Sequence, residues 1–127
     1  MMVLAVVDAK NLIETAEIDG IDAVYTINLP AEEVENVNQT LVLITDANTN
    51  LGGYGSNRFN TLRREVEVQV FYALHPSVSV DNVEVSLYRA FENAGWEIGE
   101  THGHTYDPET HQLTVTMYLY QTKVVND

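Results

Sequence analysis

The sequence predicts an α+β fold, a mainly antiparallel sheet of four to five strands with two helices on one face. Two segments repeat apolar side chains at the three- and four-residue spacing of an amphipathic helix, and others show the alternation or the short apolar runs of strands. Their order is α-β-β-β-α-β-β, for which two helices covering one sheet face is the economical arrangement. The 127 residues contain neither an internal repeat nor a Pro/Ser-rich linker, so we expect one domain over residues 1–127.

The N-terminal part of the chain predicts a helix and two strands. The helix has one apolar face, and Asp-Gly at 19–20 ends it. A strand over residues 21–30 follows, and residues 40–45 form an apolar run that suits a strand buried on both faces. Residues 46–60, rich in Asn and Gly, predict a long polar loop, and loops of that length are usually functional or mobile. The apolar face of the helix consists of Val6, Ala9, Leu12, Ile13 and Ala16.

The rest of the chain predicts a strand, a helix and a hairpin. Residues 65–72 alternate between an apolar face and a mixed one. The second helix is predicted to begin at Asp81, its N-cap, and to stop at Gly95. A hairpin over residues 96–122 has its turn at 107–110, where an Asp-Pro pair favours a turn. The expected core positions are Val66, Val68, Val70 and Tyr72 on the strand and Val83, Leu87, Ala90, Phe91 and Ala94 on the helix.

Charge and composition exclude several classes of function. Nineteen acids against six bases give a net charge of −13, and a surface this negative repels the phosphates that nucleic-acid-binding proteins neutralise. The sequence has no phosphate-binding loop, no nucleophile elbow, no HExxH pair and no cysteine. Residues 1–10 lack the basic start and long apolar stretch of a signal peptide or membrane span, so we expect folding in the cytoplasm. We expect no enzyme activity and no cofactor.

Three of the four histidines lie within ten residues of one another, beside two carboxylates, and such side chains build transition-metal sites. If a tight turn joins the hairpin strands, Tyr106 pairs with His111 and His104 with Leu113, which puts His102, His104 and His111 on one face. His102 and His111 then lie about four pairs apart, roughly 13 Å at the usual strand rise, too far for one ion. We expect no bound metal. The alternative is a two-histidine site completed by an outside carboxylate.

The second half of the chain resembles small neck- and tail-module proteins of siphophages of lactic-acid and related Gram-positive bacteria. The resemblance rests on the stretches VEVQVFYAL, VEVSLYRAFENAG and HTYDPETHQLTVTMYLY. The residues that carry it are Gln69, Phe71, Trp96, Ile98, His104, Asp107, Pro108, Thr110, Gln112 and Tyr118. The element order is also similar to that of phage tail terminators, an analogy of architecture.

The resemblance implies a structural protein of the virion neck, a tail terminator or tail completion protein with no catalytic residue. It implies a ring of six subunits that joins the tail tube protein to the head-tail connector protein, with an acidic lumen through which DNA passes without binding. Such a protein is made in the host bacterial cytoplasm and ends in the virion. The alternatives are an acidic DNA mimic that inhibits a nuclease or restriction enzyme, and a small metal-binding enzyme built on the histidine hairpin. Acidity that only keeps the protein soluble is the simplest reading of the charge.

A ring needs contacts between subunits, and three sets of residues are candidates. The first set consists of three arginines, which are half of all the bases. They are expected to meet the second set, three glutamates that form an acidic segment on the next subunit. The aromatic residues are expected on the sheet face opposite the helices, where they suit subunit packing. The alternatives are arginines that balance local acids and an aromatic layer buried within one monomer. The sets are Arg58, Arg63 and Arg64; Glu32, Glu33 and Glu35; and Phe71, Tyr118 and Tyr120.

Overall fold

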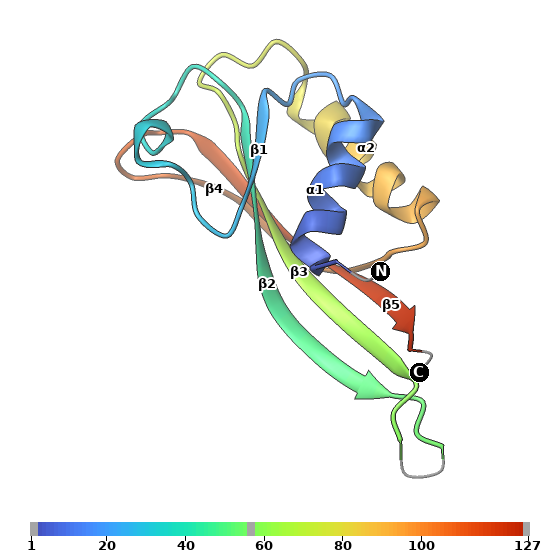
Figure 1. Ribbon diagram of the computed structural model, residues 1–127. Helices are drawn as coiled ribbons and strands as arrows, with labels where there is room; N and C mark the ends of the chain where they lie inside the picture. Colours follow the sequence, from blue (N-terminus) through green and yellow to red (C-terminus); the bar gives the residue numbers. More distant parts are fainter. Residues whose placement is uncertain (1–2, 56–57, 126–127) are drawn as a thin grey trace.

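The computed structural model of the chain describes residues 3–55 and 58–125. Within these residues two helices lie on one face of a five-stranded sheet, which confirms the predicted α+β fold and element order (Figure 1). The elements are helix α1 (Ala5–Ala16), strand β1 (Ala23–Thr26), the 3-10 helix η1 (Ala31–Glu33), strands β2 (Leu41–Gly52) and β3 (Thr61–Phe71), helix α2 (Val80–Asn93), and strands β4 (Glu97–Tyr106) and β5 (Leu113–Val124). No helix in these ranges is long and apolar enough to cross a membrane.

The sheet is mixed, with the strand order β1-β2-β3-β5-β4. The short strand β1 runs parallel to β2, whereas the pairs β2–β3, β3–β5 and β4–β5 are antiparallel. Strand β1 pairs with β2 only from Leu41 to Ile44. Among the described residues, the remainder of that edge of β2 therefore has no neighbouring strand.

The core lies between the two helices and the inner face of the sheet. The predicted alternation of β3 is confirmed, because its three valines and the following Tyr72 are fully buried on this face. At the far end of α2, Phe91 packs edge-on against Trp96 with ring centroids 5.1 Å apart. The buried apolar residues of the helices are Ala5, Val6, Ala9, Ile13, Val83, Leu87 and Phe91.

Helix α2 begins slightly earlier than expected. Ser79 is the N-cap in place of Asp81, because its Oγ accepts a hydrogen bond from the backbone N–H of Asn82 at 3.2 Å. The helix ends at Asn93, and Gly95 follows in the left-handed region at φ 86°. The predicted C-terminal stop is therefore confirmed, whereas the predicted cap is wrong by two residues.

The prediction of a polar loop over residues 46–60 is wrong for about half of that segment. Strand β2 continues to Gly52 and stays paired with β3, with a register shift between Asp46 and Asn48. The connection beyond it is compact, since the backbones of Gly55 and Arg58 exchange hydrogen bonds of 2.8 and 3.0 Å. Residues 46–51 are all exposed, so this part of the strand has no apolar face whose alternation would reveal it.

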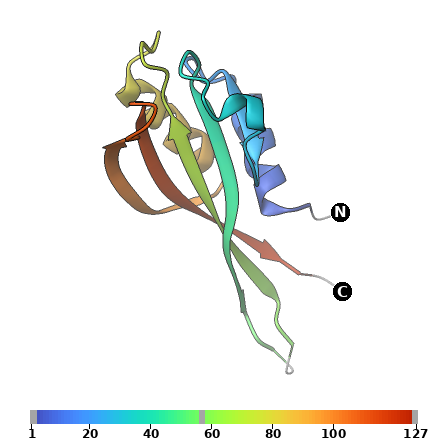
Figure 2. The ribbon, with the colours of Figure 1, turned by 90° about the vertical axis from the view of Figure 1, so that its left-hand side faces the viewer.

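The extended ribbon forms an arm, which we define as residues 47–55 and 58–64. It comprises the far part of β2, the described part of the connection and the start of β3. Figures 1 and 2 show that the arm projects well beyond the body of helices and sheet. On one side β3 is still paired with β5 along the arm, but β2 has no such support. The β2 edge of the arm is thus uncovered among the described residues.

Candidate functional site

The turn between β4 and β5 is longer than the sequence predicts. The N–H of His111 donates to the carbonyl of Asp107 at 2.8 Å, and the N–H of Asp107 donates to the carbonyl of Gln112 at 2.8 Å. His111 lies within this turn at a φ of 64°. Tyr106 consequently pairs with Leu113, and the expected pairing of Tyr106 with His111 is wrong.

The three histidines of the hairpin do not share one face. His104 lies on the helical side of the sheet, where its Nε2 is 2.6 Å from Oε2 of Glu84 on α2. His102 lies on the outer side against Tyr118, with ring centroids 5.6 Å apart. A register shift between His102 and Thr105 breaks the alternation, which is why the expected common face is wrong. The described residues contain no group of three or more His, Cys, Asp or Glu that could hold a metal ion, and the absence of metal binding stays a prediction.

Glu84 is a buried carboxylate held between two partners from other elements. The phenol of Tyr72, the residue directly after β3, donates to its Oε2 at 2.8 Å, and His104 on β4 contacts the same oxygen. Burial, followed by the hydrogen bond to Glu84, raises the pKa of the Tyr72 phenol above its ordinary value. The group joins β3, α2 and β4, so we interpret it as a connection that holds the hairpin against the helix.

The side chain of Asp107 organises the turn. Its Oδ1 accepts hydrogen bonds from the backbone N–H groups of Glu109 at 2.8 Å and Thr110 at 3.0 Å. These backbone bonds, that of Thr110 first, hold the pKa of Asp107 below its ordinary value of 3.8. A carboxylate with a lowered pKa stabilises the fold above its unfolded pKa, and that contribution is lost as pH falls through the folded pKa.

We predict that Asp107→Asn, which keeps an acceptor oxygen but removes the charge, lowers the thermal midpoint at pH 7. The difference from the wild type should shrink as pH falls below about 4, because the wild-type carboxylate is then being protonated as well. Thermal denaturation followed by circular dichroism from pH 7 to pH 2.5 measures this difference. A gap that stays constant over the whole range would mean that the charge of Asp107 contributes nothing.

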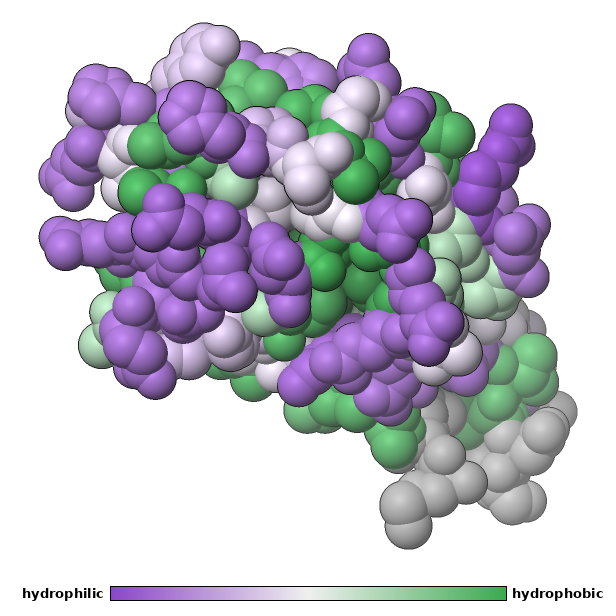
Figure 3. Space-filling view, turned by 90° about the horizontal axis from the view of Figure 1, so that it is seen from above, coloured by the Kyte–Doolittle hydropathy of each residue, from purple (hydrophilic) through white to green (hydrophobic). Residues whose placement is uncertain are grey.

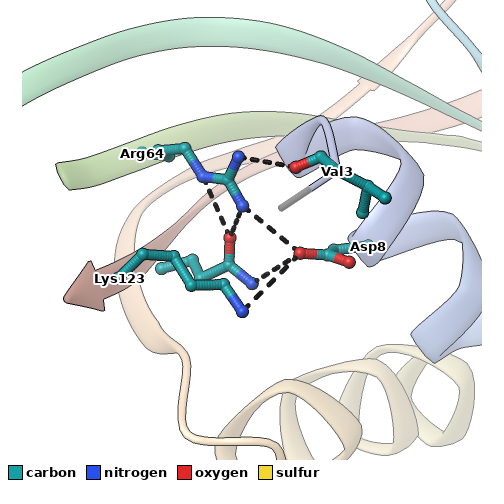
Figure 4. Close-up of polar contacts among 5 residues, drawn as sticks. Val3, Asp8, Arg64 and Lys123 are labelled. Atoms are coloured by element: carbon teal, nitrogen blue, oxygen red, sulfur yellow. Dashed lines mark hydrogen bonds and ion pairs between the residues drawn. The ribbon is translucent and has the colours of Figure 1, made fainter. Parts of the chain in front are cut away.

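Arg64 lies inside the subunit, which corrects the expectation that this arginine belongs to a subunit interface. Its guanidinium donates to the carbonyl of Val3 at 2.7 Å, to Asp8 at 3.2 Å and to the side-chain oxygen of Gln121 (Figure 4). Lys123 Nζ lies 3.9 Å from the same Asp8 carboxylate. Arg64 is only 8% exposed. The cluster therefore ties the start of α1 to β3 and β5 at the root of the arm.

Arg63 and Arg58 lie at the surface. On the outer face of the sheet, the guanidinium carbon of Arg63 is 3.7 Å from the ring centroid of Tyr120, and its Nη2 is 3.4 Å from Glu97. Tyr120 donates a hydrogen bond to Glu65, which raises the pKa of its phenol. Arg58 is exposed near the end of the arm. Glu97 thus balances the charge of Arg63 within the subunit, in line with the alternative expectation of arginines that pair with local acids.

The acidic segment lies at the other end of the sheet. Glu32 and Glu35 are exposed, whereas Glu33 accepts a hydrogen bond from the Tyr25 hydroxyl at 2.9 Å. The β4–β5 turn lies beside this segment, since Glu33 and Asp107 line the same small cavity. In Figure 3, hydrophilic residues gather on the side where η1 and this turn lie in Figure 1. We call this group of carboxylates the acidic cap: Glu32, Glu33, Glu35, Asp107 and Glu109.

The arm and the acidic cap are separated by the length of the sheet. Strand β2 starts at Leu41 beside the cap and ends at Gly52 in the arm, 12 residues that span about 35 Å at the usual rise. The Debye length at physiological ionic strength is about 8 Å, so charges at the two ends do not influence each other through solvent. The structure therefore does not bring the predicted basic and acidic sets together within one subunit.

The aromatic set lies on the outer face of the sheet, opposite the helices. Phe71, Tyr118 and Tyr120 are all half-buried. Phe71 lines the cavity beneath the acidic segment together with Leu29 and Val34, so part of its cover comes from its own chain. Tyr118 lies instead against His102, and Tyr120 lies against Arg63. The three residues consequently do not form one apolar layer within the monomer.

A groove between the two helices was not evident from the sequence. It has a volume of about 570 Å³, and its apolar wall includes Leu12, Ala90 and Trp96. Asp8 and Lys123 stand at its polar side, next to the Arg64 cluster. Helical periodicity alone does not indicate such a groove.

A family model described as "Protein of unknown function (DUF806)" matches residues 4–124. No curated protein matches the chain. Among solved structures, the chain is similar to the sheath/tube terminator of the extracellular contractile injection system PVC in its extended state, with a TM-score of 0.48 and 10% sequence identity. The match covers 100% of this chain but 59% of that terminator, so the chain spans less than two thirds of its length.

Proposed function

The chain belongs to the family described as "Protein of unknown function (DUF806)", whose model spans residues 4–124, and from that premise we propose that it is a structural protein of the phage neck. In this proposal it is a tail terminator or tail completion protein that forms a ring of six subunits. The ring joins the tail tube protein to the head-tail connector protein of a siphophage. It has no catalytic role and needs no cofactor.

The proposal rests mainly on the projecting arm. Its β2 edge has no neighbouring strand among the described residues, and large apolar side chains on it are exposed. A two-stranded ribbon of this kind is only marginally stable alone, and exposed strand edges are sites of association between chains. The unpaired strand edge and the exposed apolar side chains therefore support a role for this subunit in an assembly, and not as an independent monomer.

The charge supports a passage for DNA. A net charge of −13 places most of the surface at negative potential, which repels phosphate. A ring through which DNA slides has to avoid binding the backbone, and an acidic lumen meets that requirement. On the outer sheet face, Glu65, Glu67 and Glu97 contribute carboxylates, and Tyr118, Tyr120 and Phe71 offer half-buried surface for packing between subunits. The protein would be made in the bacterial cytoplasm and incorporated into the virion.

A phage with a stop codon early in this gene tests the proposed function. We predict filled heads and separate tails in the lysate, with few joined particles, and restoration of joining by the wild-type protein supplied in trans. Electron microscopy of the lysate counts the two kinds of particle, and gold-labelled antibody should mark the head-proximal end of wild-type tails. Normal yields of joined, infectious particles without the protein would contradict the proposal.

A further inference from the structure

The free edge of β2 lacks the features that usually protect an edge strand. Beyond Ile44, where the pairing with β1 ends, no strand in the described part of the chain lies beside this edge. Proteins commonly protect such an edge with charged residues or proline, because its unpaired N–H and C=O groups otherwise bind another strand. Residues 47–55 contain neither, although the chain has 19 acids and six bases. This edge is therefore suited to receive a further strand.

Strand β4 forms the opposite edge of the sheet, and it is open as well. It pairs with β5 on one side, and among the described residues no strand lies on its other side. One subunit cannot join its own two edges, because β3 and β5 lie between them. The three antiparallel pairs of the sheet make β4 run antiparallel to β2. A second copy placed beside β2 in the same orientation therefore offers its β4 for antiparallel pairing.

The side chains of the free part of β2 alternate between the two faces of the sheet. Thr49 pairs with Arg64, whose side chain reaches α1, so Thr49 lies on the face that the helices cover. Leu51 lies on the same face, and Asn48 and Asn50 lie on the outer face. A strand that pairs with this edge has to present its own side chains to the same faces.

The side chains of β4 alternate in the same way, with one interruption. Ile98 and Thr101 pair with buried residues of β5 and so lie on the helix-covered face, whereas His102 lies on the outer face. The register shift between Ile98 and Thr101 means that Gly99 and Glu100 together occupy one position of the ladder.

One register between the two edges brings like faces together. It places an apolar residue beside an apolar residue and a threonine beside a threonine, and both kinds of cross-strand pair stabilise a sheet. It places no acid beside another acid. The pairs are Leu51 with Ile98, Asn50 with Gly99 and Glu100 together, Thr49 with Thr101, and Asn48 with His102.

This register displaces the second copy along the strands by a definite amount. Through its partners on β5 and β3, Ile98 is level with Asp46 of β2 in its own subunit. Leu51 lies four ladder positions beyond Asp46, since their partners on β3 are Leu62 and Val66. Four positions over the four strands from β2 to β4 give one position per strand. A closed barrel of eight strands with a shear of eight has the same ratio, and its strands tilt by about 36°.

We propose that the free edge of β2 in one copy of this chain pairs antiparallel with β4 of a second copy, through residues 48–51 and 98–102. The paired segment stops short of β1, which occupies the neighbouring part of the β2 edge. The contact joins two different surfaces, so its repetition by a constant rotation closes a ring. This inference rests on the proposed ring and deepens it by naming the contact that joins its subunits.

Cysteine cross-linking tests the register directly, because the chain has no cysteine of its own. Thr49→Cys in one preparation is mixed with Thr101→Cys in a second, tagged preparation, and disulfide formation between them is followed on non-reducing gels. The control is Thr105→Cys, which is also exposed on β4 but lies outside the proposed pairing. We expect the Thr49–Thr101 pair to form at least tenfold faster than the Thr49–Thr105 pair. Equal rates would overturn the proposal.

An acid placed on the β2 edge provides a second test. Asn50→Glu suits its own subunit, where Arg63 is the cross-strand partner, but it faces Glu100 of the next copy in the proposed register. It should weaken self-association at least tenfold in analytical ultracentrifugation, and Glu100→Lys in the same chain should restore association to within threefold. Asn82→Glu, the same change at an exposed position on α2, should have little effect. If Asn50→Glu and Asn82→Glu weaken association equally, or if Glu100→Lys does not rescue, the two edges do not pair.

The contact and the proposed function fail in different ways. If the wild type forms rings but the Thr49–Thr101 pair forms no faster than its control, the strand pairing is wrong and the ring stands. If the pair forms rapidly but the phage lacking the protein still joins heads to tails, the pairing is right and the proposed role in the neck is wrong. A protein that stays monomeric at every concentration, with no preferred cross-link, overturns both.

Discussion

Arg64→Ala should lower the free energy of unfolding by about 2–4 kcal/mol, because it removes one partner of a largely buried ion pair. Among the described residues, the substitution leaves Asp8 with the more distant Lys123 as its cation, and it takes a donor from the buried amide of Gln121 and from the carbonyl of Val3. Because the side chain of Asp8 is partly exposed to solvent, the loss of stability should be smaller than for a fully buried pair. Urea denaturation followed by circular dichroism measures the change.

Arg63→Ala is the matched control, because it removes the neighbouring arginine from the exposed face. Its pair with Glu97 is solvent-accessible on both sides, so we expect a loss of about 1 kcal/mol or less. Arg64→Lys should fall between the two, since it keeps the charge but not the planar group that reaches three partners. Equal losses for Arg64→Ala and Arg63→Ala would contradict the structural role of the buried cluster.

Gly20→Ala should cost about 2–4 kcal/mol, the sum of backbone strain and overpacking. Gly20 has a φ of 96°, and a Cβ there would lie 2.9 Å from Cγ2 of Val83 and 3.0 Å from Cβ of Val78. Val83 is fully buried on α2 and has stiff side-chain geometry, so it cannot give way cheaply. The turn after α1 thus passes against α2 with room for a glycine alone.

Gly95→Ala isolates the strain from the overpacking. Gly95 has a similar φ of 86°, but a Cβ at this position meets no atom within 4 Å. We therefore expect a loss of about 1–2 kcal/mol, smaller than that of Gly20→Ala by the cost of the clash. The same urea titration gives both values. If the two variants lose equal stability, the close approach of Gly20 to α2 has no energetic consequence.

Much of the fold could be predicted because each core element has one apolar face. The spacing of Val83, Leu87 and Phe91 indicated α2, and the alternating valines indicated β3, and both are buried as expected. The stop at Gly95 followed from the need for a left-handed residue after a helix. The expected N-cap, Asp81, was wrong because Ser is as good an N-cap residue as Asp and Ser79 lies two positions earlier.

The arm could not be predicted by the same reasoning. Residues 46–50 are exposed throughout, their sequence of Asp, Ala, Asn and Thr has no apolar period, and Asn is depleted in strands. Their strand conformation comes from pairing with β3, a partner supplied by tertiary structure. The hairpin register failed for a related reason, since the left-handed His111 lengthens the turn in a way that Asp-Pro does not reveal.

The candidate site was predictable only in part. The sequence pointed to the arginines as a group, yet the burial of Arg64 depends on Asp8 and Gln121, which lie 56 and 57 residues away along the chain. Glu84 offered a clearer sign: it lies three residues before Leu87 and seven before Phe91, a spacing that puts this carboxylate on the buried face of α2. A buried acid requires a partner, and His104 fills that role.

Native mass spectrometry of the purified wild-type chain over increasing concentration tests whether the protein assembles into the proposed closed ring. We expect one dominant assembly of six subunits, about 85 kDa from the 14.2 kDa chain, with no larger species as concentration rises. A monomer at every concentration, or an open series of sizes that keeps growing, would contradict it.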